Sequence, residues 1–236
     1  METIGIIGAM NTEVLNLISH MENVTAHTIA RRRFYIGTLS GRNAIVVQSG
    51  IGKVAAAITA QLLIDHYHVD FLLNTGMGGA LDKDLRPKDL VISSGAVQHD
   101  FNLRSFGHVR GYIYGDDDTR PTVFEADKRL IAAAEAAAAE VLPAGSKAVV
   151  GLVASGDVFV DESRMKSKIV EYYGASIAEM EGGAVAHVAE VNGIPFLILR
   201  TVSDMADESA RVSIDDLERY VGDLAGDITI AMLRHL

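Results

Sequence analysis

The sequence predicts an α/β fold, a three-layer α/β/α sandwich around a mixed, mostly parallel central sheet. Short β-rich apolar runs alternate along the chain with runs of helical period, which favours parallel strands covered by helices. Two strand-like runs flank Ser40 and Gly41, so an antiparallel hairpin makes the sheet mixed. No linker interrupts the pattern, and 236 residues can close one core. We therefore expect a single domain over residues 1–236.

The first third of the chain supplies three strands and two helices to this prediction. Residues 3–8 are apolar and β-branched, which indicates a buried strand. Asn11 is expected to cap the following helix, whose apolar residues recur at helical spacing from Val14 to Met21. The hairpin is expected at residues 34–39 and 44–48, and a helix at 53–66.

The middle and the end of the chain continue the alternation. Strands are expected at residues 69–74, before the glycine cluster Gly76, Gly78 and Gly79, and at 89–94, 147–154, 177–180 and 196–202. Helices are expected at residues 126–141, 165–173 and 181–192. A capping box at residues 213–216 predicts the start of a terminal helix that runs to about residue 236. Residues 98–122 show no period and form a long loop, a feature that is often functional.

Composition excludes several classes of protein. Hydrophobic residues make up 49% of the chain and charged residues 22%, as in globular proteins. The net charge of −10 argues against broad binding to nucleic acid or to an anionic membrane. The absence of cysteine excludes disulfides and thiolate chemistry. The apolar run at residues 4–10 is too short for a signal peptide, so we expect a soluble, cytoplasmic protein.

Polar and glycine-rich residues gather just after the predicted strands. Because the carboxyl ends of strands in open α/β sheets meet at one crevice, these loops are expected to form one pocket. The loops are residues 8–13, 49–53, 75–79, 155–160, 179–181 and 203–204.

Two nucleotide motifs and a metal site are not supported by these loops. A P-loop needs Ser or Thr after its lysine, whereas Lys53 is followed by Val54. The dinucleotide fingerprint that begins at Gly76 has Leu81 at its sixth position. His66 and His68 lie two residues apart and cannot share a helix face. We expect no cofactor and no metal.

Carboxylates remain as candidate catalytic groups. Taken alone, Glu13 can be a first-turn residue favoured by the helix dipole, Glu179 or Glu181 a helix cap, and Asp204 a turn residue. Together they place carboxylates on one predicted rim, which suits acid–base chemistry.

The ordered set of motifs closely resembles the 5′-methylthioadenosine/S-adenosylhomocysteine nucleosidases of the purine nucleoside phosphorylase-like superfamily. The resemblance covers nearly the whole chain, and the set is far more specific than any one motif. It rests on residues 5–10 (GIIGAM) with Glu13, 49–55 (SGIGKVA), 74–76 (NTG), 155–159 (SGDVF), 179–181 (EME) and 203–204 (SD).

The resemblance implies hydrolysis of the N-glycosidic bond of methylthioadenosine and S-adenosylhomocysteine, with release of adenine, in methionine salvage. Glu13 matches the glutamate that activates water, and Glu181 the glutamate that binds the ribose hydroxyls. Asp204 matches the acid that protonates adenine N7, oriented by Ser203.

The remaining substrate contacts are carried over in the same way. Phe159 matches the aromatic residue that stacks on the base, and the backbone of Val160 reads the adenine edge. Other matched positions are Met180 beside the sugar, Ile51 near the 5′-thio group and Arg200 near the water, with Met10, Gly79 and Glu179 also expected to contact substrate. The family also implies a homodimer whose partner contributes to the 5′ pocket.

The chain departs from the family pattern at three places. Met77 and Gly78 stand where the family usually has serine and alanine, which is expected to reshape the wall near the ribose or the attacking water. Asn11 and Thr12 replace two acids. The aromatic loop at residues 106–114 matches only loosely, so the choice of 5′ group is the weakest inference.

Three alternatives remain open at the level of sequence. A nucleoside phosphorylase would need cationic groups where Glu13 stands, and a carboxylate there repels phosphate. An aminodeoxyfutalosine nucleosidase shares the motifs, and Met77 with the unusual loop is compatible with it. A non-catalytic nucleoside-binding protein would have no need of Glu13, Glu181 and Asp204.

Overall fold

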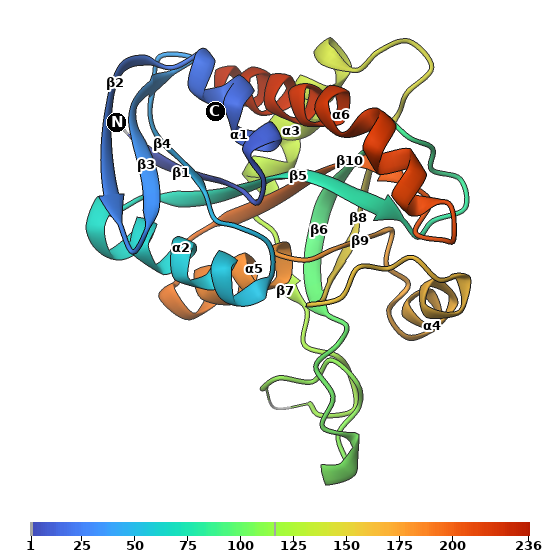
Figure 1. Ribbon diagram of the computed structural model, residues 1–236. Helices are drawn as coiled ribbons and strands as arrows, with labels where there is room; N and C mark the ends of the chain where they lie inside the picture. The colour runs from blue at the N-terminus through green and yellow to red at the C-terminus, as the bar shows by residue number, and fades with distance from the viewer. Residues whose placement is uncertain (1, 116) are drawn as a thin grey trace.

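A computed structural model describes residues 2–115 and 117–236, without the side chains of residues 211–216. A large sheet lies between two groups of helices (Figure 1), so the predicted three-layer architecture is confirmed. One face is covered by α1 (Asn11–Ser19), α3 (Lys128–Val141) and α6 (Ala210–Met232). The other is covered by α2 (Lys53–Tyr67) and α5 (Gly182–Asn192), while α4 (Ser163–Tyr173) packs at one end of the molecule.

The sheet combines a parallel centre with antiparallel additions. Strands β4 (Arg42–Gln48), β1 (Thr3–Gly8), β5 (Phe71–Ala80) and β10 (Phe196–Asp204) run parallel in that order. Beyond β4, β3 (Arg32–Leu39) and β2 (Glu22–Ile29) add the predicted hairpin and an antiparallel edge.

The other half of the sheet closes on itself. Strands β6 (Leu90–Gln98), β8 (Ala148–Ser155) and β9 (Ile177–Glu179) follow β10, and β9 pairs back with β5. A short strand, β7 (Phe124–Glu125), pairs with β6. This closure brings together the carboxyl ends of β5, β8, β9 and β10, which the sequence pattern alone leaves unordered.

The glycine cluster lies inside β5, and the prediction that the strand ends at Asn74 is wrong. A Cβ atom on Gly78 would lie 2.8 Å from the carbonyl oxygen of Ala178 in β9. A Cβ on Gly79 would lie 2.7 Å from the Asp204 carboxylate. The glycines thus let β9 and the end of β10 approach β5 closely, which a turn-based interpretation of glycine overlooks.

Other boundaries also differ from the predictions. The N-cap residue of α1 is Met10 rather than Asn11, and α6 begins at Ala210, three residues before Ser213. The capping hydrogen bonds expected within residues 213–216 lie outside the described side chains. Strand β2 was not predicted because nearly all of its side chains are exposed, so it shows no apolar alternation.

The long loop between β6 and β7 is confirmed and projects from the body of the molecule (Figure 1). Its only described helical turn is the 3₁₀ segment Arg104–Phe106, and Phe106 is 79% exposed. Among the described residues, no helix is long and apolar enough to cross a membrane.

Candidate active site

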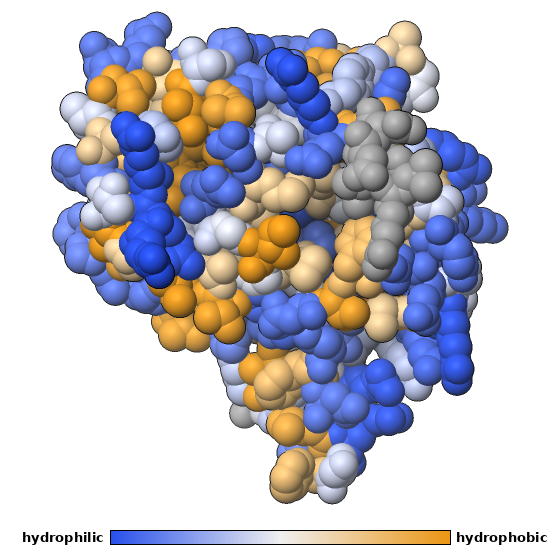
Figure 2. Space-filling view, viewed as in Figure 1, coloured by the Kyte–Doolittle hydropathy of each residue, from blue (hydrophilic) through white to orange (hydrophobic). Residues whose placement is uncertain are grey.

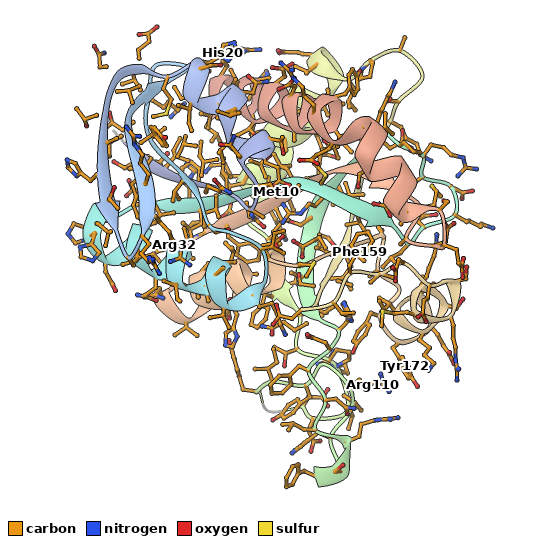
Figure 3. All side chains as sticks on the ribbon, in the orientation of Figure 1. Met10, His20, Arg32, Arg110, Phe159 and Tyr172 are labelled. Atoms are coloured by element: carbon orange, nitrogen blue, oxygen red, sulfur yellow. The ribbon has the colours of Figure 1, made fainter. Side chains whose placement is uncertain are left out.

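A cavity of about 240 Å³ lies at the carboxyl ends of the central strands. Figure 2 shows a hollow at the centre of this face, and Figure 3 marks two of its residues, Met10 before α1 and Phe159 before α4. All six predicted loops contribute to the lining. The lining residues are Ala9, Met10, Glu13, Ile51, Met77, Gly78, Gly79, Val158, Phe159, Val160, Ala178, Glu179, Met180, Glu181, Ser203 and Asp204.

Glu13 is a buried carboxylate with both oxygens held by backbone N–H groups. Ala9 N–H and Met10 N–H donate to Oε2 at 2.7 and 3.0 Å, and Met77 N–H donates to Oε1 at 3.1 Å. Gly76 has no room for a side chain because its Cβ would collide with this carboxylate. Burial raises the pKa of Glu13, although the charge of Arg200 and the three hydrogen bonds oppose the rise. Glu13 is therefore a fixed group of increased basicity.

Glu179, in the lining of the cavity, and Arg200, outside that lining, form a buried ion pair. Arg200 Nη2 contacts Glu179 Oε2 and donates to Asn74 Oδ1 at 2.6 Å. Glu179 also accepts hydrogen bonds from the Ser155 hydroxyl and from Gly182 N–H. Burial disfavours the charged carboxylate, but the charge of Arg200 and these hydrogen bonds hold the pKa of Glu179 below its usual value. The Glu179 carboxylate therefore has a structural role, since an ion pair and several hydrogen bonds occupy its oxygens.

Glu181 has a different environment although it lies only two residues away. Its Oε1 accepts a hydrogen bond from Gly52 N–H at 2.9 Å, and its Oε2 lies 3.6 Å from Arg200 Nη2. Burial and the charge of Glu179 raise the pKa of Glu181 to about 7, because Arg200 compensates it only partly. Glu181 therefore lines the cavity as a carboxyl group that is easily protonated.

Asp204 ends β10 on the opposite side of the site. Its Oδ2 accepts a hydrogen bond from the Ser203 hydroxyl at 2.7 Å, and its Oδ1 accepts one from Ala206 N–H at 2.8 Å. Ser203 Oγ also lies 3.2 Å from the carbonyl oxygen of Gly78, a second and more distant acceptor for its one proton. Burial raises the pKa of Asp204. Asp204 is thus an oriented carboxyl group with a raised affinity for a proton.

The cavity walls between these carboxyl groups are largely apolar. Phe159 is 37% exposed and lines the cavity beside the buried Val160. Ile51 is 59% exposed and borders the opening, with Met10 and Met180 also in the lining. A flat aromatic face beside apolar walls and a few oriented polar groups is typical of a site for a small heteroaromatic ligand.

The structure brings together eleven of the twelve residues that the sequence singled out, and Arg200 is the one that does not line the cavity. Its nearest polar partners are Asn74, Glu179 and the carbonyl oxygen of Leu199. Ser155 belongs to one of the predicted pocket loops and Asn74 to one of the motifs, but the sequence gives neither residue a role, since a supporting contact has no local pattern. Within the described residues no cluster of side chains could hold a metal ion.

Fold and site together define a protein of the nucleoside phosphorylase class, with a closed mixed sheet and a nucleoside-sized cavity at its strand ends. The model of the phosphorylase superfamily matches residues 3–235. Within that superfamily, the chain belongs to the family of the 5′-methylthioadenosine/S-adenosylhomocysteine nucleosidases.

Three relatives illustrate the membership. The 5′-methylthioadenosine/S-adenosylhomocysteine nucleosidase of Shewanella halifaxensis is 39% identical over 234 residues, which is 99% of each chain. The nucleosidase of Colwellia psychrerythraea, solved in complex with adenine, is 33% identical with a TM-score of 0.93, and the match covers 100% of this chain and 96% of that one. The futalosine hydrolase of Helicobacter pylori is 32% identical with a TM-score of 0.91 and covers 100% of this chain and 98% of the other.

Proposed function

We propose that the protein hydrolyses the N-glycosidic bond of 5′-methylthioadenosine and S-adenosylhomocysteine, releasing adenine and a 5-thioribose product. One observation carries the proposal: the buried residues Glu13, Glu181 and Asp204 line a single cavity, and each is bound by different hydrogen-bond donors. The three groups can supply a base for the water, a negative charge beside the sugar and an acid for the leaving group. Membership of the nucleosidase family supports the same reaction.

Glu13 is assigned to the attacking water. Its carboxylate cannot rotate because three backbone N–H groups hold it, and its raised pKa makes it a better base than an exposed glutamate. It accepts one proton from the water while the oxygen adds to the anomeric carbon. A base fixed before the substrate arrives needs no reorganisation during the reaction.

Asp204 is assigned to the leaving group. Adenine departs poorly as an anion, so a proton at N7 must accompany departure of the electron pair of the glycosidic bond. Burial raises the pKa of Asp204, which increases the affinity of the carboxyl group for a proton, and Ser203 and Ala206 fix its orientation. Phe159 offers the base a stacking surface beside it.

Glu181 is assigned to the sugar. As the glycosidic bond lengthens, positive charge develops on the ribose ring, and a nearby carboxylate stabilises that charge. Glu181 is held by Gly52 N–H at 2.9 Å, and in this assignment its second oxygen accepts a hydrogen bond from a ribose hydroxyl. The buried pair of Glu179 and Arg200 fixes the backbone that carries it.

Hydrolysis is favoured over phosphorolysis by the charges around the site. A phosphate beside Glu13 would face a carboxylate at short range. Arg200, the buried cation nearest these groups, is bound to Glu179 and Asn74 and does not line the cavity. Water, which is uncharged, meets no such repulsion.

A futalosine-type nucleoside is the second candidate substrate. The Helicobacter pylori relative named futalosine hydrolase matches the whole of this chain. Met77 gives the cavity wall an unbranched apolar side chain next to Glu13, where the family usually has serine. A flexible thioether accommodates substrates of different shape, so it does not restrict the site to one 5′ group.

We also propose that the active form is a homodimer. Val54 of α2 and Val191 of α5 are exposed apolar side chains that line one shallow groove, and the exposed Ile58 follows Val54 on α2. The exposed Ile51 at the cavity mouth lies just before this helix. Figure 2 shows hydrophobic residues over this part of the body and on the projecting loop. A second copy of the chain would cover this surface and extend the pocket beyond Ile51.

We further propose that residues 1–236 act as one nucleosidase domain, that the protein is cytoplasmic and that it serves methionine salvage.

The test is adenine release from purified protein, measured with methylthioadenosine, S-adenosylhomocysteine, adenosine and aminodeoxyfutalosine. The apolar 5′ region predicts that kcat/KM for methylthioadenosine exceeds that for adenosine by at least about tenfold, or ~1.4 kcal/mol. Adding phosphate should change neither the rate nor the sugar product. A sugar phosphate product, or a clear preference for aminodeoxyfutalosine, would replace the proposed reaction or the proposed substrate.

A further inference from the structure

Helix α4 connects the two segments of the cavity that face the base. The segment with Phe159 and Val160 leads directly into α4, which begins at Ser163. On the other side, the turn that follows Asp204 packs against the first two turns of the same helix. Both segments are irregular, so their relative position depends on what joins them.

Two residues of α4, Lys166 and Ser163, make the hydrogen bonds that connect the helix to the turn after Asp204. Lys166 Nζ donates a hydrogen bond of 2.6 Å to the carbonyl oxygen of Met205, the residue after Asp204. Ser163 donates to the Glu208 carboxylate through its backbone N–H at 3.1 Å and its hydroxyl at 2.6 Å. Lys166 is half-buried, whereas Glu208 is exposed at the first turn of the helix, where its charge is favourable.

The hydrogen bonds from α4 affect the orientation of Asp204 through the short turn that follows this residue. Asp204 Oδ1 is bound by Ala206 N–H, and Ala206 follows the carbonyl that Lys166 holds. If the Met205 peptide moves, the N–H group that orients the carboxyl moves with it. A displacement near 1 Å at a reacting group can lower a rate by about 10²-fold.

We infer that Lys166, supported by Ser163 and Glu208, is a positioning residue that holds the Asp204 turn in register with the base-stacking segment. This inference rests on the proposed role of Asp204 as the acid for adenine N7. Lys166 lies outside the cavity lining and does not touch the substrate. Its loss should therefore weaken protonation of the leaving group and leave the water and sugar groups intact.

The test compares two substrates in the variants Lys166→Met, Lys166→Arg and Ser163→Ala. One substrate is methylthioadenosine, whose adenine needs a proton, and the other is a nitrophenyl 5′-methylthioriboside, whose nitrophenolate departs without one. Lys168→Met is the matched control, because Lys168 lies on the same helix but lines a different cavity beside His99.

For Lys166→Met we expect kcat on methylthioadenosine to fall at least about fivefold with KM nearly unchanged, and the nitrophenyl substrate to change less than about twofold. Ser163→Ala should show a smaller loss of the same kind. Lys166→Arg restores a cationic donor and should recover most of the rate, while Lys168→Met should match the parent protein.

Two results would overturn the inference: a parent-like rate for Lys166→Met on methylthioadenosine, or equal losses on both substrates. Failure of the underlying role of Asp204 has a different signature. In that case Asp204→Asn itself would still cleave methylthioadenosine, or would lose both substrates equally.

Discussion

At the scale of single residues, the four acidic groups of the site owe their different properties to their partners. Among the described residues, the direct partners of Glu13 are backbone N–H donors, whereas Glu179 has a close ion pair with Arg200. Glu181 has one N–H and Arg200 at 3.6 Å, and Asp204 has a hydroxyl and an N–H. Burial is common to all of them. The sign of each pKa shift therefore depends on whether the partners outweigh desolvation, which they do only for Glu179.

The first residue-scale prediction concerns Glu13. Glu13→Gln retains the shape of the side chain but cannot accept the proton of the attacking water, so hydrolysis should fall by ~10²–10⁴-fold. Substrate affinity should change little. Stopped-flow assays of adenine release and calorimetric binding of methylthioadenosine measure the two effects separately. A rate within a few-fold of the parent protein would remove Glu13 from the mechanism.

The stability of the protein should also depend on pH through Glu181. Glu181 has a pKa of about 7 in the folded protein and an ordinary value near 4.5 when unfolded. Between these values the folded protein binds more protons than the unfolded chain, so the free energy of unfolding falls as pH rises through this window. Glu13 and Asp204, whose pKa values are also raised, act in the same direction.

Urea denaturation from about pH 5 to pH 8 measures this slope, and Glu181→Gln should reduce it by roughly 1–3 kcal/mol over the range. Glu179 itself stays ionised throughout because its pKa is lowered, but Glu179→Gln should flatten the curve in part, because the charge of Glu179 contributes to the raised pKa of Glu181. A slope that Glu181→Gln leaves unchanged would mean that Glu181 is already ionised in the folded protein.

At the scale of elements, the close approach of β9 to β5 places Glu179, Met180 and Glu181 in the cavity. That approach depends on Gly78, which stands where the family pattern usually has alanine. β9 therefore lies against a glycine backbone with no side chain between the two strands.

Gly78→Ala tests this contact. A Cβ 2.8 Å from the carbonyl oxygen of Ala178 must displace backbone, which should cost ~1–3 kcal/mol and lower kcat/KM through movement of Glu181. Gly226→Ala is the comparison variant, because the three atoms nearest its Cβ, at 3.0–3.1 Å, belong to the side chain of Asn16 rather than to backbone, and alanine favours the helix. Both variants are to be measured by thermal unfolding and by adenine release. Parent-like values for Gly78→Ala would show that β9 does not need this spacing.

At the scale of the whole molecule, closure of the sheet through β5, β10, β6, β8 and β9 gathers the strand ends at one opening. The exposed apolar residues of α2 and α5 and the projecting loop lie on the side of that opening (Figure 2). Assembly and substrate binding are therefore expected to be linked.

Light scattering should give a mass of twice 25.3 kDa, and a stable interface should bury on the order of 2,000 Å². Replacing Val54 and Val191 together by glutamate should produce monomers with lower activity, since both side chains are 69% exposed in the single chain. Leu15→Glu is the control, because Leu15 is 51% exposed on α1. Full activity in the monomeric double variant would contradict a shared pocket.

Much of this architecture could be predicted because its signals are local. Thr3–Gly8 has a continuous apolar run, α2 begins at the expected residue, Lys53, and the strand-end loops stand out by composition. Strand β2 gave no such signal because its exposed residues do not alternate, and the glycines of β5 resembled a turn.

Local patterns in the sequence are enough to predict the fold class, the succession of most helices and strands, and the six loops that line one cavity, because periodicity, turn chemistry and motif order are properties of neighbouring residues. Three contacts became visible only in the folded chain: β9 returns to β5, Arg200 binds Glu179 and Asn74 behind the cavity, and Lys166 reaches the turn after Asp204. These contacts join residues that are far apart in the chain. Their geometry and the pKa shifts that follow from burial arise from packing, which no local pattern encodes.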